Sequence, residues 1–434
     1  MPPSTKLILL ELNEINFEML RGYAEEGRLP AFRRLIDTHG LHTTTSETEY
    51  ENLEPWIQWV TAHTGLELKE HGVFRLGDIV ENDLDQIWER LERDYGVRTG
   101  AVSPMNAQNR AKKPAFFIPD PWTNTEVVGP PAVLRLFQAV RQLVNDNASG
   151  RITLRSALDL GVGMVRFARP LNYSRYAKAL ATSARNPWRK PILLDLLLAD
   201  LFIDQLNATR PGFASLFLNA GAHIQHHYLF NSSHYEGDQK NPDWYIHPSK
   251  DPILEVYEAY DQIVGDIQKQ FSDCRLMVAT GLHQKPHART TFYWRLKNHP
   301  SFLDLMKVPF QSVEPRMSRD FLVNCESSEQ AVRAEAILST ATGEDGLPLF
   351  EVDNRGESLF VMFSYPRDIA KDFSWSVGEM RFSDLSKYVS FVAVKNGEHD
   401  GLGYFLDTEK GPAPLSEQFP LHQLSGAILE SFSE

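Results

Sequence analysis

The chain has 434 residues, enough to bury the core of one large domain or of a domain with an insertion. Hydrophobic residues make up 42% and charged residues 23%, a balance typical of globular proteins. The formal net charge of −13 excludes a general nucleic-acid binder, because such proteins need a basic surface.

Cysteine usage and the terminal segment set the expected compartment. Cys274 and Cys325 cannot form a disulfide framework, and the N-terminal apolar run is too short for a signal peptide. We therefore expect a cytoplasmic protein. The most apolar later stretch, 191–206, is interrupted by three aspartates, which favours a buried helix over a membrane span.

The first hundred residues alternate strand and helix signals. Strands are predicted at 6–13 and 97–102, and helices at 16–27, 31–39, 55–64 and 82–95. This β-α-β order predicts parallel strands joined by right-handed crossovers.

Strand signals then stop between 107 and 189. The segment FFIPDPW, which begins at Phe116, reads as a loop rich in proline and aromatic residues, and helical pieces follow it. We predict a helical cap at 107–189, with this loop lining a cleft, inserted into a core of 1–106 and 190–434.

The remaining chain returns to strand and helix patterns. Helices are predicted at 191–207, 253–270, 328–340 and 414–432, strands at 213–218, 275–279, 320–325, 358–364 and 389–395, and a loop at 283–299. The whole pattern predicts an α/β fold, a doubly wound and mainly parallel sheet with an inserted helical cap.

Polar residues at the end of the first strand are the first site candidates. Glu11 and Asn13 follow an apolar run, and ligands of doubly wound sheets bind at the carboxyl ends of the strands. The alternative is that these polar residues only cap the helix that begins near residue 16.

Histidines gather after the strand at 213–218. Asn219 ends the strand, and His223, His226 and His227 follow it. On a helix, His223 and His227 lie one turn apart on one face, which suits a metal such as zinc, iron or manganese. The alternative is three histidines that only form hydrogen bonds in a polar loop.

The order of motifs resembles the alkaline phosphatase superfamily, and within it the type I phosphodiesterase/nucleotide pyrophosphatase branch. The matching parts are the first strand, an "LPxxxxL" segment at 29–35, and a helix that ends in Thr64-Gly65 before His71-Gly72. The resemblance implies an alkaline-phosphatase-like fold and a metal-assisted reaction at an ester.

The family's metal-binding positions can be located one by one. Asn13 stands where the family has the Asp that ends the first strand, and Asn219 and His223 fall on its "DxxxH" motif. His399 falls on its last metal-binding histidine, before a glycine-rich turn. The nucleophile position falls on Pro55.

Because several acidic positions are lost, a two-metal mechanism with a Thr or Ser nucleophile is not expected. The resemblance implies one zinc or manganese ion, or none. Its candidate ligands are Glu11, Asn13, Asn219, His223, His227 and His399. Glu51 and Glu54 lie near the missing nucleophile, and His283 follows Gly281-Leu282, which replace the family's Asp-His; these three are the catalytic candidates.

Basic side chains near these motifs are candidates for binding the substrate anion. They are Arg75, Arg289, Arg319 and Lys395. The guanidinium fork suits phosphate, sulfate or carboxylate, although each residue could instead form a surface ion pair.

Two functions are consistent with these features. The first is an enzyme that hydrolyses or transfers a phosphate or sulfate ester, with a sugar or nucleotide-sugar as a candidate substrate. The second is an inactive pseudo-hydrolase that binds an anionic glycan or a protein partner. Neither function involves nucleic acid or a membrane span, and the oligomeric state stays open.

Overall fold

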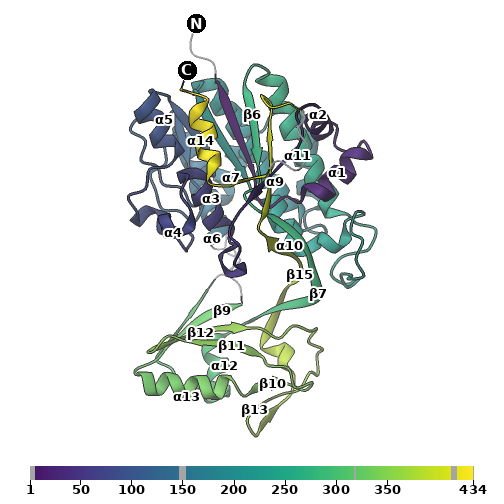
Figure 1. The fold of residues 1–434 in the computed structure, drawn as a ribbon. Helices are drawn as coiled ribbons and strands as arrows, with labels where there is room; N and C mark the ends of the chain where they lie inside the picture. The colour runs from purple at the N-terminus through teal and green to yellow at the C-terminus, as the bar shows by residue number, and fades with distance from the viewer. Residues whose placement is uncertain (1–4, 146–152, 317–318, 412–417, 434) are drawn as a thin grey trace. The chain divides into compact units, whose positions relative to one another are not determined.

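The computed structural model describes residues 5–145, 153–316, 319–411 and 418–433 (Figure 1). The chain divides into two compact units. The first comprises Met1–Gly237, His247–Pro286 and Gly397–Glu434, and the second Asp238–Ile246 and His287–Asn396. Among the described residues, no helix has both the length and the apolar composition needed to cross a membrane.

The first unit is built on an eight-stranded sheet in the order β17-β2-β16-β6-β1-β5-β3-β4. Its strands are β1 (Leu7–Leu12), β2 (His42–Thr45), β3 (Thr99–Val102), β4 (Phe116–Ile118), β5 (Phe213–Leu218), β6 (Arg275–Ala279), β16 (Leu402–Asp407) and β17 (Gln418–Pro420). Among the described residues the strand pairings of this sheet are parallel, except those of β16, which runs antiparallel to β2 and β6. All residues of β1 are buried, as expected for a central strand covered on both faces.

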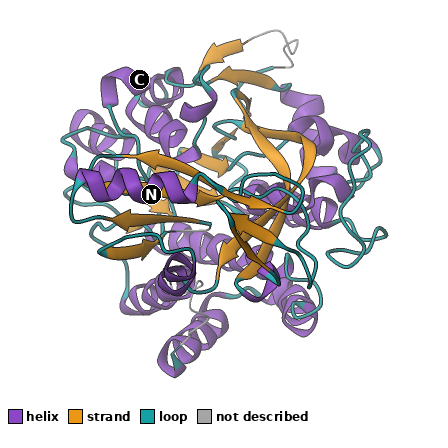
Figure 2. Cartoon of the chain, turned by 90° about the horizontal axis from the view of Figure 1, so that it is seen from below, coloured by secondary structure: helices purple, strands orange, loops and turns teal. Residues whose placement is uncertain are grey.

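Helices cover both faces of this sheet. They are α1 (Phe17–Glu25), α2 (Pro30–His39), α3 (Pro55–Thr64), α4 (Leu68–His71), α5 (Ile87–Tyr95), α6 (Pro131–Asn145), α7 (Leu154–Phe167), α8 (Tyr173–Thr182), α9 (Arg189–Thr209), α10 (Ala220–Tyr228), α11 (Pro252–Gln270) and α14 (Gln423–Glu430). Figure 1 shows α3, α5 and α14 on one side of the strands and α1, α2 and α11 on the other. Figure 2 shows the same chain from below, with helices in purple and strands in orange. The predicted fold class, α/β with a doubly wound and mainly parallel sheet, is confirmed.

Local sequence signals account for the ends of several helices. Asn16 caps α1 by accepting a hydrogen bond from the Met19 backbone at 3.0 Å. Pro55 begins α3, and Gly65 ends it with a φ of 76°, a left-handed conformation that glycine adopts without strain. The predicted bounds of α3 and β5 therefore agree with the structure.

The second unit contains antiparallel sheets. Their orders are β11-β12-β9-β8 and β10-β13-β14, formed by β8 (Ser312–Pro315), β9 (Asp320–Asn324), β10 (Ala341–Gly343), β11 (Phe350–Asn354), β12 (Ser358–Phe363), β13 (Trp375–Val377) and β14 (Met380–Phe382), with helices α12 (His299–Leu305) and α13 (Ser328–Leu338). Trp375 stacks between Phe302 and Phe382 in its core. The chain leaves the first unit along β7 (His283–Leu296) and returns along β15 (Val389–Asp400), and these two strands pair.

This second unit corrects the predicted organisation, which assigned 287–396 to the core. The antiparallel strands bury an aromatic core of their own, so their apolar faces are covered without packing on the central sheet. The prediction of a loop at 283–299 is also wrong, because most of these residues form the strand β7. Histidine and arginine masked the alternation of its segment TTFYWRL, which is typical of a strand.

The segment 107–189 is mainly helical, as α6, α7 and α8, and it belongs to the first unit. Residues 146–152 of the predicted cap lie outside the described residues, as do 412–417, which include the start of the predicted helix at 414–432. The loop that was expected at FFIPDPW begins instead with β4, the edge strand next to β3. Its three strand residues are buried, so tertiary pairing prevailed over the nearby prolines.

The buried His71 predicts a loss of stability in acid. Its Nδ1 accepts a hydrogen bond from the Val73 backbone and its Nε2 lies 3.1 Å from Thr61 Oγ1, so the neutral ring is satisfied. Burial lowers the pKa of His71 from 6.5 to about 4. As the pH falls from about 6.5 to about 4, the unfolded chain binds this proton first, and up to about 3 kcal/mol of stability is lost.

His71→Asn keeps an acceptor for Val73 but carries no charge in this range, so part of the pH dependence should disappear. Thermal unfolding at pH 7.5 and pH 5 measures this. The control His39→Asn changes a partly exposed histidine at the end of α2 and should keep the slope of the parent protein. An unchanged slope in His71→Asn would refute the assignment.

Candidate metal centre

Glu14, His226 and His399 converge in the first unit. Their ligand atoms all lie within 4.8 Å of one another. Glu14 Oε2 lies 3.2 Å from His226 Nε2 and 3.1 Å from His399 Nε2. Within the part of the chain that the structure describes, these three residues form the group of His, Cys, Asp or Glu side chains that could hold a metal ion.

Glu14 reaches the centre because the chain turns sharply after β1. Its φ of 60° is left-handed, which is uncommon for a residue with a side chain and marks a constrained site. The Glu14 backbone donates a hydrogen bond to Thr280, just after β6, and accepts one from the Gln284 backbone. Glu14 thus lies at the carboxyl end of β1, between the ends of its neighbours β5 and β6, where doubly wound sheets bind ligands.

The two histidines come from distant segments. His226 belongs to α10, which follows β5, and its Nδ1 lies 3.4 Å from the Gly397 carbonyl oxygen. His399 lies on β15, and it forms a hydrogen bond with the Leu53 backbone just before α3. Its Nδ1 is also 4.0 Å from Glu54 Oε2. Partners of this kind fix the orientation of imidazole ligands.

The Glu14 carboxylate is oriented by two amides. Asn13 Nδ2 donates to Oε1 at 3.0 Å, and Gln284 Nε2 donates to Oε2. Burial alone would raise the pKa of Glu14, but the imidazoles of His399 and His226 hold it well below its ordinary value. Burial alone would lower the pKa of His399, but the Glu14 carboxylate raises it. The centre is therefore a buried anion between two imidazoles.

These residues fit a divalent metal. His399 Nε2 is buried and makes no well-aligned hydrogen bond within the described chain, although it faces Glu14. Zinc ligands about 2 Å from the ion in a tetrahedron lie roughly 3.3 Å from one another, close to the two observed separations. One carboxylate and two imidazoles form a donor set that suits zinc or manganese and leaves a coordination position for substrate.

The predicted Asn13 and Asn219 lie beside the centre. Asn13 Nδ2 also donates to Asn219 Oδ1 at 2.8 Å, and Asn13 Oδ1 accepts from Trp59 Nε1 at 2.8 Å. The only side-chain oxygen of Asn13 is thus already occupied by an indole. We interpret this amide pair as the support that positions Glu14.

Glu11 is not brought to the centre. Its Oε1 lies 3.2 Å from His63 Nε2, and both side chains are completely buried, on the side of the sheet that faces α3 and α5. His223 and His227 form a separate pair with ring centroids 4.7 Å apart. His223 is exposed, and it does not belong to the convergent group.

The catalytic candidates are dispersed. Glu54 is adjacent to His399, whereas Glu51 lies exposed on the short helix η1 (Tyr50–Asn52). His283 is engaged elsewhere: its Nδ1 lies 2.6 Å from the Leu402 carbonyl oxygen, and burial lowers its pKa. Gln284, the residue after it, is the one that contacts Glu14.

The basic candidates divide between the two units. Arg75 is an exposed residue of the first unit, between α4 and the short helix η2 (Asp78–Glu81). Arg289, Arg319 and Lys395 belong to the second unit, where the Arg319 guanidinium lies 3.7 Å from the centre of the Tyr293 ring. None of these four side chains is part of the convergent group.

Sequence reasoning missed Glu14 and His226 as ligands. Glu14 directly follows the predicted Asn13, and His226 was named among the histidines after the strand at 213–218. The ligands chosen there were their neighbours Glu11, Asn13, His223 and His227. The signal that could have found Glu14 is chemical, because it is the first carboxylate after the strand.

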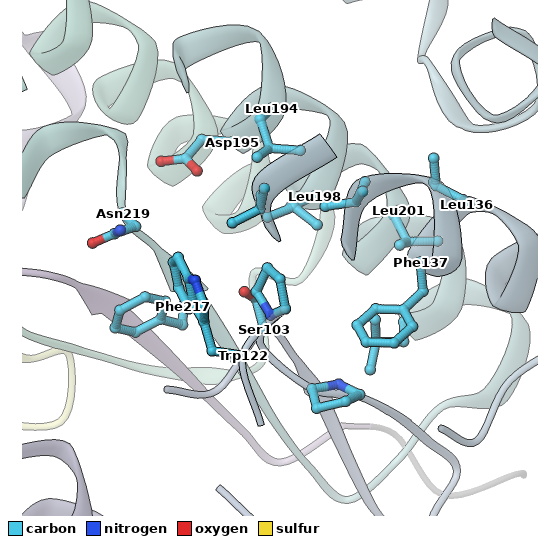
Figure 3. A pocket seen from close by; sticks show the side chains of 15 residues that line it. Ser103, Trp122, Leu136, Phe137, Leu194, Asp195, Leu198, Leu201, Phe217 and Asn219 are labelled. Carbon is cyan, nitrogen blue, oxygen red and sulfur yellow. The ribbon is translucent and has the colours of Figure 1, made fainter. Parts of the chain in front are cut away.

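A largely apolar cavity of about 80 Å³ adjoins Asn219. Figure 3 shows Asn219 and Asp195 at one end and Leu136 and Phe137 of α6 at the other. Pro119, Pro121 and Trp122 also line it, so the latter part of the FFIPDPW segment does line a pocket. The Asp195 carboxylate accepts hydrogen bonds from Tyr260 and from the Ala220 backbone, so it is already engaged at the start of α10.

No protein-family model matches the chain, and no curated protein matches its sequence. Several solved structures resemble it at low identity. The alkaline phosphatase PafA has 9% identity and a TM-score of 0.47, with 100% of this chain and 96% of that chain covered. Human ectonucleotide pyrophosphatase/phosphodiesterase 5 has 11% identity and a TM-score of 0.45, with 99% and 95% covered.

A phosphonoacetate hydrolase from Sinorhizobium meliloti 1021 has 13% identity and a TM-score of 0.43, with 99% of this chain and 96% of that chain covered. Since all three TM-scores lie below 0.5, the fold class rests on the strand order and pairing described above.

Proposed function

We propose that this protein is a metal-assisted enzyme that hydrolyses or transfers a phosphate or sulfate ester. The observation that carries the proposal is the convergence of Glu14, His226 and His399 at the carboxyl end of β1. A zinc or manganese ion held by these residues would polarise the ester and lower the pKa of a bound water or acceptor hydroxyl.

The surrounding residues would position the reaction. Asn13 and Gln284 keep the Glu14 carboxylate in place, and Leu53 with Glu54 orient His399. Among the described residues, the N-cap residue Glu54 makes no side-chain capping hydrogen bond to the first turn of α3, and a helix N-terminus favours an anion. Pro55 offers no hydroxyl at the family's nucleophile position, so attack by water or an acceptor hydroxyl is the simpler route.

The cavity favours a particular kind of ester. Its lining by Phe137, Leu198 and Phe217 suits an apolar group on the substrate better than a bare sugar. Anionic glycan and nucleotide-sugar substrates remain the competing candidates from the sequence. A panel of esters with apolar groups and with sugar groups separates these two classes of substrate.

Reconstitution of the full chain tests the proposal. Protein stripped by a chelator should take up one equivalent of zinc or manganese and regain activity on a panel of chromogenic phosphate monoesters, phosphodiesters and sulfate esters. His226→Ala and His399→Ala should lose both metal and activity. His223→Ala on the same helix should retain both.

The outcomes separate the two functions. Metal uptake without turnover of any ester would favour the binding protein, which the absence of a hydroxyl at Pro55 also fits. Failure to bind either metal, or loss of binding only in His223→Ala, would overturn the proposed centre.

A further inference from the structure

The segment of α7 and α8 has an unusual surface. Thirteen large hydrophobic residues are exposed among those described, and seven of them fall between Leu154 and Leu180. They are Leu154, Leu158, Val162, Val165, Leu171, Tyr173 and Leu180, with exposed fractions of 54–82%. Scattered exposed hydrophobic residues are normal, but such a local concentration marks an interaction surface.

The helical spacing places the residues of α7 on one face. Leu154, Leu158, Val162 and Val165 follow one another at intervals of four, four and three residues. The inner side of α7 is already packed, because Gly163 and Phe167 are buried and Gly163 closely approaches Leu136 of α6. The outer apolar face is therefore not needed by the core of this unit.

The segment that carries these exposed hydrophobic residues is locally basic. Between 153 and 190 the sequence has eight Arg and Lys residues and one acidic residue, Asp159, although the whole chain has a net charge of −13. Four of the basic residues are exposed and form no ion pair with a carboxylate of the described chain. These four are Arg175, Lys178, Arg185 and Lys190. Arg166, by contrast, pairs with Asp204.

We propose that the exposed face of α7 and α8 docks on the surface of an anionic lipid bilayer. Apolar side chains flanked by Lys and Arg are the composition of helices that lie in a membrane interface, where the aliphatic residues enter the acyl region and the cations meet the headgroups. A symmetric contact with a second copy would bring the same positive charges together, which argues against self-association. The proposal is independent of the metal centre.

Vesicle flotation of the full chain tests the docking. The protein should float with vesicles of phosphatidylcholine and phosphatidylglycerol at low salt, and at least about fivefold less with phosphatidylcholine alone. Because the chain is acidic overall, binding to an anionic surface requires a local basic face. The double variants Leu158→Asp/Val165→Asp and Lys178→Glu/Arg185→Glu should each bind about tenfold more weakly.

Val332→Asp is the matched control, because Val332 is 58% exposed, close to the 61% of Leu158, but lies on α13 of the second unit. It should bind like the parent protein, and all variants should keep the parent melting temperature. No flotation with the anionic vesicles, or equal loss in the control, would overturn the proposal. The proposal would also be overturned by a different pair of results. In that case the parent protein would not bind vesicles, and light scattering would show an oligomer that the variant Leu158→Asp/Val165→Asp dissociates.

Discussion

Glu14→Gln is expected to weaken zinc or manganese binding by at least about a hundredfold and to abolish turnover of the ester. The change removes the only carboxylate of the convergent group and keeps the size of the side chain. It also turns an acceptor into a donor, so the new amide nitrogen would face either Asn13 Nδ2 or Gln284 Nε2, which both donate hydrogen bonds.

Calorimetric titration of the chelator-treated protein measures the loss. Glu14→Asp is a graded comparison, since it keeps the charge but draws the carboxylate back by one methylene. Its affinity for the metal should fall between those of the parent protein and Glu14→Gln. Glu51→Gln is the control, because Glu51 is exposed on η1 and should leave both affinity and activity unchanged. Equal affinity in Glu14→Gln and the parent protein would show that Glu14 is not a ligand.

His63→Leu is expected to destabilise the first unit by about 3–5 kcal/mol, because it leaves the Glu11 carboxylate buried without a partner. Glu11 is 0% exposed and His63 1% exposed, and their contact of 3.2 Å lies beside the rings of Trp59 and Trp88. Neither Glu11 Oε2 nor His63 Nδ1 has a hydrogen-bond partner within the described chain. The pair therefore has little support beyond its single contact.

The complementary changes should differ in size. Glu11→Leu leaves a buried imidazole in place of a buried carboxylate and should cost less, about 1–3 kcal/mol. The double variant Glu11→Leu/His63→Leu removes both polar groups, and its stability should exceed that of either single variant. Hydrogen exchange of peptides from β1 and α3 reports the free energy of opening of this unit. A double variant as unstable as the sum of the two single variants would mean that the residues do not act as a pair.

Local signals in the sequence were enough for the parallel strands β1, β3, β5 and β6 of the first unit, but not for β2, β4, β16 and β17 of the same sheet. The apolar runs of β1, β5 and β6 and the amphipathic pattern of α11 gave nearly the observed bounds, because burial on a sheet or helix face imposes a period that a short window reveals. Pro55 and Gly65 bounded α3 for an equally local reason, the φ values that these residues favour. The α/β class followed from the order of the elements alone.

The second unit was decided by tertiary structure. Its strands β9 and β12 were predicted, but their sequence does not say which strands they pair with. Only the antiparallel pairing with β8 and β11, and the buried cluster around Trp375, separates them from the central sheet. The long β7, whose alternation His and Arg residues masked, pairs with β15 about a hundred residues further along the chain, and a short window of sequence does not reveal that pairing.

The sequence by itself determined that polar residues after β1, after β5 and near residue 399 belong to one region, because parallel strands present their carboxyl ends at the same edge. Which of these residues meet was decided by backbone geometry. Glu11 lies within β1, and its side chain points to the face that α3 and α5 cover, where it meets His63. Glu14 lies beyond the strand with a positive φ, and this turn aims its carboxylate at His226 and His399. A contact among residues 14, 226 and 399 depends on the order of the strands and on this one dihedral angle, and neither leaves a periodic trace in the sequence.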